Sequence, residues 1–165
     1  MIIDFQKAIN IVESYKKKGK KVGYITGCFD ILHINHIELF IEAKEKIDIL
    51  VIGIENDESI EISKGEGKPI NNLSIRLKQI SELRHVDYVF AINEVYKFGS
   101  DEAISVHKKL FKKLKPNCLL TRITADKYWK RKLAITKELN IGFIPINKAK
   151  TTSSSEIFTK LIETE

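Results

Sequence analysis

The stretch GCFDILHINH at residues 27–36 decides how this chain folds. The segment VGYIT at 22–26 precedes it, and its apolar character predicts a buried strand. Gly27 allows the backbone to turn tightly as it leaves that strand. After the stretch, a helical spacing predicts a helix over 36–46 whose inward residues are Ile37, Phe40, Ile41 and Ala43. The order strand, turn-rich loop, helix is typical of an α/β protein.

The segments on either side continue this alternation. A helical spacing over 4–18 precedes the first strand and ends at Gly19. Apolar runs predict further strands, and serines offer caps for a closing helix over 155–162. The runs lie at 48–54, 86–92, 117–123 and 141–146. We therefore predict the α/β class, with a doubly wound parallel sheet of about five strands and helices on both faces.

Length and composition indicate the number of domains, the cellular location and whether the protein binds a metal. With 165 residues, 43% of them hydrophobic, the chain has material for one core, so we expect a single domain over 1–165 with an added N-terminal helix within 1–20. No segment has the apolar length of a signal peptide or membrane span, so we expect a cytoplasmic protein with no membrane partner. Cys28 and Cys118 are too far apart to suggest a zinc site or disulfide framework, and we predict no protein-bound metal.

The net charge of +6 fits either nucleic acid or a small polyanion such as a triphosphate. Lysines gather at 16–21 and at 108–115, each near the end of a predicted helix, where cations interact favourably with the helix dipole. Apart from Phe111, no aromatic residue lies within these clusters, so neither has the regular aromatic interleaving of a strand-binding groove. A nucleic-acid partner is therefore disfavoured.

Two histidines mark the candidate site. His33 and His36 bracket the predicted helix start, where free backbone N–H groups and the helix dipole attract anions. In doubly wound sheets, ligands bind beyond the carboxyl ends of the strands, often near the loop after the first strand. The residues alone leave the alternative that His33 is a surface loop residue and His36 a helix cap.

The longer motif resembles a known signature. GCFDILHINH closely resembles the GxFDxxHxGH string of the cytidylyltransferase-like nucleotidyltransferases, a superfamily of Rossmann-like three-layer α/β/α enzymes. The segment at 64–90, with a basic loop and an Arg-bearing helix, and TTSSSEI at 151–157 resemble further family elements. Within the superfamily, these motif sequences are most similar to those of the heptose-phosphate adenylyltransferase and glycerol-3-phosphate cytidylyltransferase group.

The resemblance implies transfer of an AMP or CMP group from ATP or CTP, with Mg²⁺, to a small phosphorylated acceptor, with release of pyrophosphate. The acceptor phosphate is already a nucleophile, so the enzyme has to supply placement and charge neutralisation. The group also implies a homodimer, and its wording favours ATP and a sugar phosphate. The resemblance assigns catalytic roles to His33, His36 and Arg76, and nucleotide binding to Gly27, Cys28, Phe29, Asn35, Lys64, Lys68, Ser153, Ser154 and Ser155.

Several of these residues have simpler interpretations. Arg76 could form a helix-surface salt bridge, and Lys64 and Lys68 could belong to a solvated loop. The serines at 153–155 could simply cap the last helix. Asp30 is expected to be structural, turning its loop by bonding to its own backbone.

The chain departs from the family pattern at two places. Asn35 stands where the family has glycine, so it either adopts a left-handed conformation or places a side chain where backbone approaches phosphate. TRITADKYWKRK at 121–132 replaces a Gly-Gly-Asp stretch, with Asp126 and Trp129 as candidates for the same space, although Trp129 also fits an ordinary packed aromatic. The alternative to an active transferase is a non-catalytic nucleotide-binding regulatory module.

Overall fold

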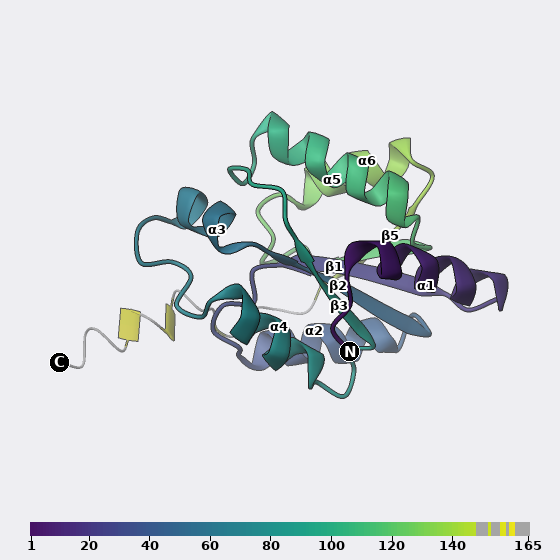
Figure 1. Cartoon of the computed structure of the whole chain (residues 1–165), viewed down its shortest axis with the longest axis horizontal. Helices are drawn as coiled ribbons and strands as arrows, with labels where there is room; N and C mark the ends of the chain where they lie inside the picture. The colour runs from purple at the N-terminus through teal and green to yellow at the C-terminus, as the bar shows by residue number, and fades with distance from the viewer. Residues whose placement is uncertain (148–151, 153–155, 158, 161–165) are drawn as a thin grey trace.

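The computed structural model describes residues 1–147, 152, 156–157 and 159–160 (Figure 1). Within them, five parallel strands form one sheet in the order β3-β2-β1-β4-β5. The strands are β1 (Val22–Gly27), β2 (Ile49–Glu55), β3 (Tyr88–Ile92), β4 (Cys118–Arg122) and β5 (Gly142–Ile146). The predicted doubly wound parallel sheet is confirmed.

Helices cover both faces of the sheet. Figure 1 shows α1, α5 and α6 on one face and α2 and α4 on the other, with α3 beyond the end of the sheet. The helices are α1 (Phe5–Lys17), α2 (Ile34–Lys44), α3 (Asp57–Lys64), α4 (Leu73–Ser81), α5 (Asp101–Leu114) and α6 (Trp129–Glu138). Residues 156–157 and 159–160 are helical, and the rest of the predicted closing helix over 155–162 lies outside the described residues.

The continuous apolar runs are explained by burial on both faces of the sheet. In β1, Tyr24 packs into the core under α1 and α5, whereas Ile25 packs into the core under α2 and α4. In β2, Val51 and Ile52 divide between the two cores in the same way. Because neighbouring side chains point to opposite faces and both faces are covered, most positions of the central strands are apolar, and the exceptions Thr26 and Glu55 lie at the carboxyl ends.

Polar caps fix where most of the helices begin. Asp4, Asn56, Asn72 and Ser100 each accept a hydrogen bond from the backbone N–H three residues ahead. His33 holds the same position before α2, but its side chain makes no capping hydrogen bond. The helix that carries the histidine motif therefore begins without using that imidazole as a cap.

The strand order reverses at β1, which lies between β2 and β4, and this is where doubly wound sheets bind ligands. At the far edge, residues 1–3 run beside β3, where Ile3 N–H donates to the Val89 carbonyl at 2.9 Å and Val89 N–H to the Met1 carbonyl at 3.0 Å. No helix in the described part of the chain has the length and apolar character that crossing a membrane requires.

Candidate functional site

A cavity of about 850 Å³ opens at the carboxyl ends of β1, β2 and β4, with further walls from α2, α5 and the loops after β3 and β4. Its volume lies within the range of small-molecule sites. It brings together eight residues that the resemblance assigned to the site: Gly27, Cys28, Phe29, His33, Asn35, His36, Lys64 and Lys68.

The two motif histidines are stacked on one another at the start of α2. Their ring centroids are 3.8 Å apart and their planes differ by 24°. Burial, together with the charges of His33, Lys64 and Arg122, lowers the pKa of His36 to about 3. His36 is thus a neutral imidazole that can donate a hydrogen bond to a phosphate oxygen.

The turn before α2 supports the histidine pair. Phe29 adopts a left-handed backbone conformation, with φ of 51°, which is uncommon for a bulky residue. Its ring lies 5.2 Å from that of His36, and a Cβ atom on Gly27 would come within 3.0 Å of it. Gly27 is therefore needed for packing, whereas the left-handed residue of the turn is Phe29, whose ring supports His36.

Asp30 connects this turn to the basic loop. Its carboxylate accepts hydrogen bonds from the backbone N–H groups of Ile70 and Asn71 at 2.9 and 2.8 Å, and its carbonyl accepts from the Asn71 amide. The expected structural role is confirmed, but Asp30 bonds to residues 70–71 rather than to its own backbone. This contact fixes the loop that carries Lys68.

Arg76 bonds to the backbone of the loop after β1. Its side chain is fully buried, and it is not among the residues lining the cavity. It donates to the carbonyls of Cys28 and Asn71 at 2.6 and 2.9 Å and to the Asp57 carboxylate at 2.6 Å. The guanidinium thus holds the loop after β1, and the predicted contact of Arg76 with a phosphate stays a prediction.

Lys64 and Lys68 place positive charge at the rim of the cavity. Lys64 ends α3 and is exposed, while Lys68 is half-buried in the loop that follows. The charge of Lys64 opposes the effect of burial, which raises the pKa of the Cys28 thiol to about 11. Cys28 therefore presents an uncharged thiol and its backbone to the cavity.

Asn35 is helical, so the expectation of a left-handed conformation at this position is wrong. Its side chain is buried and donates to the carbonyl of Thr152. Thr152 and Glu156 also line the cavity. Ser153, Ser154 and Ser155 lie outside the described residues, so their predicted role is unchanged.

Arg122 was not singled out from the sequence. It ends β4, is 4% exposed and lines the cavity. Its guanidinium lies 3.3 Å from the Glu42 carboxylate and 3.8 Å from that of Glu38, so it joins β4 to α2. Its place as the last residue of a buried apolar strand, at the carboxyl end where such sheets bind ligands, is the signal that could have identified it.

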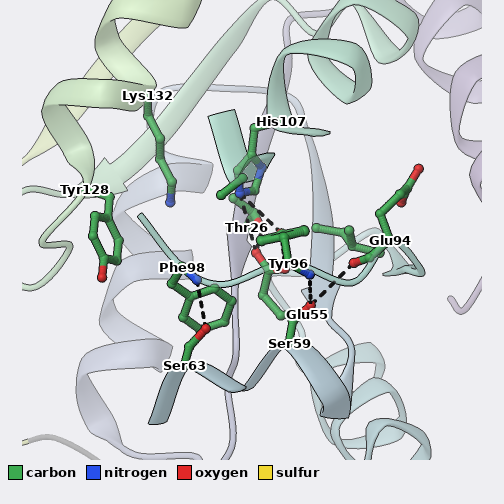
Figure 2. Close-up of polar contacts among 12 residues, drawn as sticks. Thr26, Glu55, Ser59, Ser63, Glu94, Tyr96, Phe98, His107, Tyr128 and Lys132 are labelled. Atoms are coloured by element: carbon green, nitrogen blue, oxygen red, sulfur yellow. Dashed lines mark hydrogen bonds and ion pairs between the residues drawn. The ribbon is translucent and has the colours of Figure 1, made fainter. Parts of the chain in front are cut away.

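A second polar cluster lines the cavity (Figure 2). Glu55 accepts a hydrogen bond from Thr26 Oγ1 at 3.0 Å and another from the Tyr96 hydroxyl. His107 Nε2 lies 3.3 Å from that hydroxyl and 3.9 Å from Glu55 Oε1. We refer to these four residues as the Glu55 cluster.

Burial is the largest influence on the pKa values of Glu55 and His107 in this cluster. It raises the pKa of Glu55, an effect that the hydrogen bond from Tyr96 opposes. It also lowers the pKa of His107 to about 3, and the positive charge of Lys132 acts in the same direction. His107 is therefore neutral. The sequence held a signal for it, because His107 falls on the buried stripe of α5 with Ala103, Leu110, Phe111 and Leu114.

Of the two residues expected from the segment after β4, Asp126 lines the cavity and Trp129 does not. Asp126 lines the cavity and accepts from Thr121, the Tyr128 backbone and Lys132. Although burial opposes ionisation of Asp126, Lys132 and these hydrogen bonds lower its pKa. Trp129 lies outside the cavity lining and packs near Phe143, as an ordinary half-buried aromatic would. Among the residues described, no three His, Cys, Asp or Glu side chains are grouped as metal ligands.

Comparison with known proteins gives a family match. A family model described as cytidylyltransferase-like matches residues 24–160. The bifunctional protein HldE of Nitratiruptor sp. is 38% identical over 93 residues, which are 56% of this chain and 20% of that protein. The HldE of Paramagnetospirillum magneticum is 34% identical over 105 residues, 64% of this chain and 20% of the relative. The chain thus spans about a fifth of the length of these curated relatives.

Solved structures show the same fold. A lipopolysaccharide core biosynthesis protein from Thermoplasma volcanium matches with a TM-score of 0.61 at 28% identity, covering 80% of this chain and 100% of that one. Pantoate-beta-alanine ligase from Francisella tularensis matches with a TM-score of 0.65 at 18% identity, covering 97% of this chain and 76% of that one. The second likeness is one of fold alone.

Proposed function

The chain belongs to the cytidylyltransferase-like family and is a nucleotidyltransferase, and we propose that it transfers the AMP or CMP group of ATP or CTP to a small phosphorylated acceptor. The wording of the first motif favours ATP as donor and a sugar phosphate as acceptor. A polyol or alcohol phosphate is the alternative acceptor.

The stacked pair of His33 and His36 at the start of α2 is the observation that carries this proposal. The start of α2 and the neutral imidazole of His36 line the same cavity as Lys64 and Lys68. Hydrogen-bond donors and cations placed in this way suit a triphosphate, whose charge has to be neutralised before another anion can approach.

The reaction needs placement rather than a base. An oxygen of the acceptor phosphate attacks the α-phosphorus, forming a new P–O bond, while the bond to the β-phosphate oxygen breaks and pyrophosphate leaves with that electron pair. We assign Lys64 and Lys68 to phosphates, and His33 and His36 to the oxygens around the α-phosphorus. Ser153, Ser154 and Ser155 remain proposed ligands of the outer phosphates.

We propose that Mg²⁺ enters with the triphosphate. Mg²⁺ keeps several waters and commonly binds through substrate phosphates and one or two carboxylates. The cavity lining includes Asp30, Glu55 and Asp126, each with hydrogen-bond partners in the protein. The residues present thus fit a metal ion held mainly by the nucleotide, where it would neutralise phosphate charge.

Pyrophosphate release tests the proposal. ATP and CTP would each be paired with heptose 1-phosphate, glycerol 3-phosphate and ethanolamine phosphate in the presence of Mg²⁺. We expect at least one pair to react, and His36→Ala to slow that reaction by about 100-fold or more, as loss of a transition-state donor typically does. His85→Ala is the matched control, because His85 is half-buried outside the cavity.

Silence from every pair, with ATP or CTP still binding by calorimetry, would contradict the proposed reaction and favour a nucleotide-binding module. The homodimer expected from the resemblance stays a prediction that light scattering can check. Nucleic acid is still not expected as a partner, and a filter-binding assay at several salt concentrations tests this.

A further inference from the structure

The proposed reaction uses the histidine pair and the basic loop but gives no role to the Glu55 cluster. Thr26 and Glu55 lie at the carboxyl ends of β1 and β2, Tyr96 follows β3, and His107 comes from α5. Four separate segments thus bring polar side chains to one wall of the cavity, as Figure 2 shows. Burying these groups is costly unless hydrogen bonds compensate.

The cluster retains capacity for hydrogen bonds. A carboxylate has about four acceptor positions, and the Thr26 and Tyr96 hydroxyls occupy two of them by donating to Glu55, so acceptor positions remain for a ligand. The ion pairs found among the described residues join Glu55 to no lysine or arginine, and His107 carries no charge. This wall therefore suits a ligand with neutral hydrogen-bond donors and acceptors.

Positive charge beside the cluster restricts the ligand further. Lys132 and Arg131 line the same cavity, and the charge of Lys132 influences both Glu55 and His107. Lys132 is paired with Asp126 at 2.7 Å, and Arg131 donates to the carbonyl of Gly99. Although both cations already have partners in the protein, they suit a ligand that carries a phosphate group beside its hydroxyl groups.

Resting on the proposed function, we propose that the Glu55 cluster is the acceptor subsite and that it recognises the hydroxyl groups of a phosphorylated polyol or sugar. The acceptor phosphate then points toward the histidine pair, where the α-phosphorus lies. A cavity of about 850 Å³ has room for a nucleotide and a small acceptor together. The cluster selects phosphorylated acceptors with hydroxyl groups over those that lack them.

The test compares acceptors that differ in hydroxyl groups. Glycerol 3-phosphate and propyl phosphate have the same chain length, and only the first carries hydroxyls. We expect wild-type kcat/KM to favour glycerol 3-phosphate over propyl phosphate by about 100-fold, because polar sites reject analogues that leave their groups unpaired. Glu55→Gln should reduce this preference about tenfold, through KM for the hydroxylated acceptor, with nucleotide Kd unchanged.

Two further variants keep the result interpretable. Tyr96→Phe removes one hydroxyl from the cluster with little change in shape and should weaken the same preference, which matters if Glu55→Gln fails to fold. Glu94→Gln is the matched control, because Glu94 is exposed and lies outside the cavity lining. It should leave every parameter within twofold of wild type.

The outcomes separate the two proposals. An active enzyme in which Glu55→Gln and Tyr96→Phe change all acceptors equally, or change only nucleotide affinity, would overturn the acceptor subsite and leave the proposed function standing. If no pair releases pyrophosphate, ligand-observed NMR with glycerol 3-phosphate and propyl phosphate decides the subsite independently. A binding preference lost in Glu55→Gln supports the subsite, and equal binding of both phosphates refutes it.

Discussion

Arg76 lies fully buried beneath the turn after β1, where one guanidinium serves two backbone carbonyls and a carboxylate. We predict that Arg76→Met lowers the free energy of unfolding by about 2–4 kcal/mol, because the carbonyls of Cys28 and Asn71 lose their donors. Urea denaturation would measure the change. The exposed Arg84 provides the control, and Arg84→Met should shift stability by no more than about 0.5 kcal/mol.

If Arg76→Met is as stable as wild type but binds the nucleotide much more weakly, Arg76 contacts a phosphate after all. The sequence predicted that Arg76 lies near the candidate site, but not that its guanidinium bonds to backbone carbonyls. A motif fixes which residues lie near the nucleotide, whereas burial decides whether a guanidinium faces ligand or backbone. Glu55 and Tyr96 were missed for a related reason, since the sequence does not show that β2 and the loop after β3 meet at one wall.

Among the elements, α2 links the parts of the site. Its first turn carries His36 and also Asn35, whose side chain donates to the Thr152 carbonyl. Farther along α2, Glu38 and Glu42 pair with Arg122 and so join the helix to β4. We predict that Asn35→Ala costs about 1–2 kcal/mol of unfolding free energy, because the Thr152 carbonyl loses a partner, and that nucleotide Kd rises several-fold. Asn10→Ala, which changes an exposed residue of α1, is the control for urea denaturation and calorimetry.

If Asn35→Gly gave full stability and faster turnover, Asn35 would be only an obstruction at the family's glycine position. The elements themselves were predictable, and the first helix and the strand cores lie within about two residues of expectation because apolar runs and caps determine them locally. The contact between Asn35 and Thr152 was not predictable in this way. It joins residues that are 117 positions apart, and a local sequence pattern cannot predict a contact between such distant residues.

For the whole molecule, two buried neutral histidines make stability depend on pH. Burial lowers the pKa of both His36 and His107 from 6.5 to about 3, so the unfolded chain binds protons below pH 6.5 that the folded chain does not. Their contribution to stability is complete above pH 6.5 and is lost progressively as pH falls toward 3. We predict a loss of about 2 kcal/mol for each histidine between pH 7 and pH 5.

Urea denaturation at pH 7.5, 6.0 and 5.0 measures this dependence. His107→Gln should remove about half of the slope, because a glutamine has no proton to gain, while Asn10→Ala, which changes no titratable group, should leave the slope unchanged. An equally steep slope in His107→Gln would show that other groups control the acid sensitivity.

The pairing of residues 1–3 with Val89 has a consequence for interactions between molecules. An uncovered edge strand can recruit the strand of another chain and begin aggregation. Residues 1–3 occupy the outer edge of β3, and at the opposite edge β5 contains Pro145, which has no N–H to donate. Three residues on the far side of the sheet from the cavity thus protect the protein against self-association through its backbone.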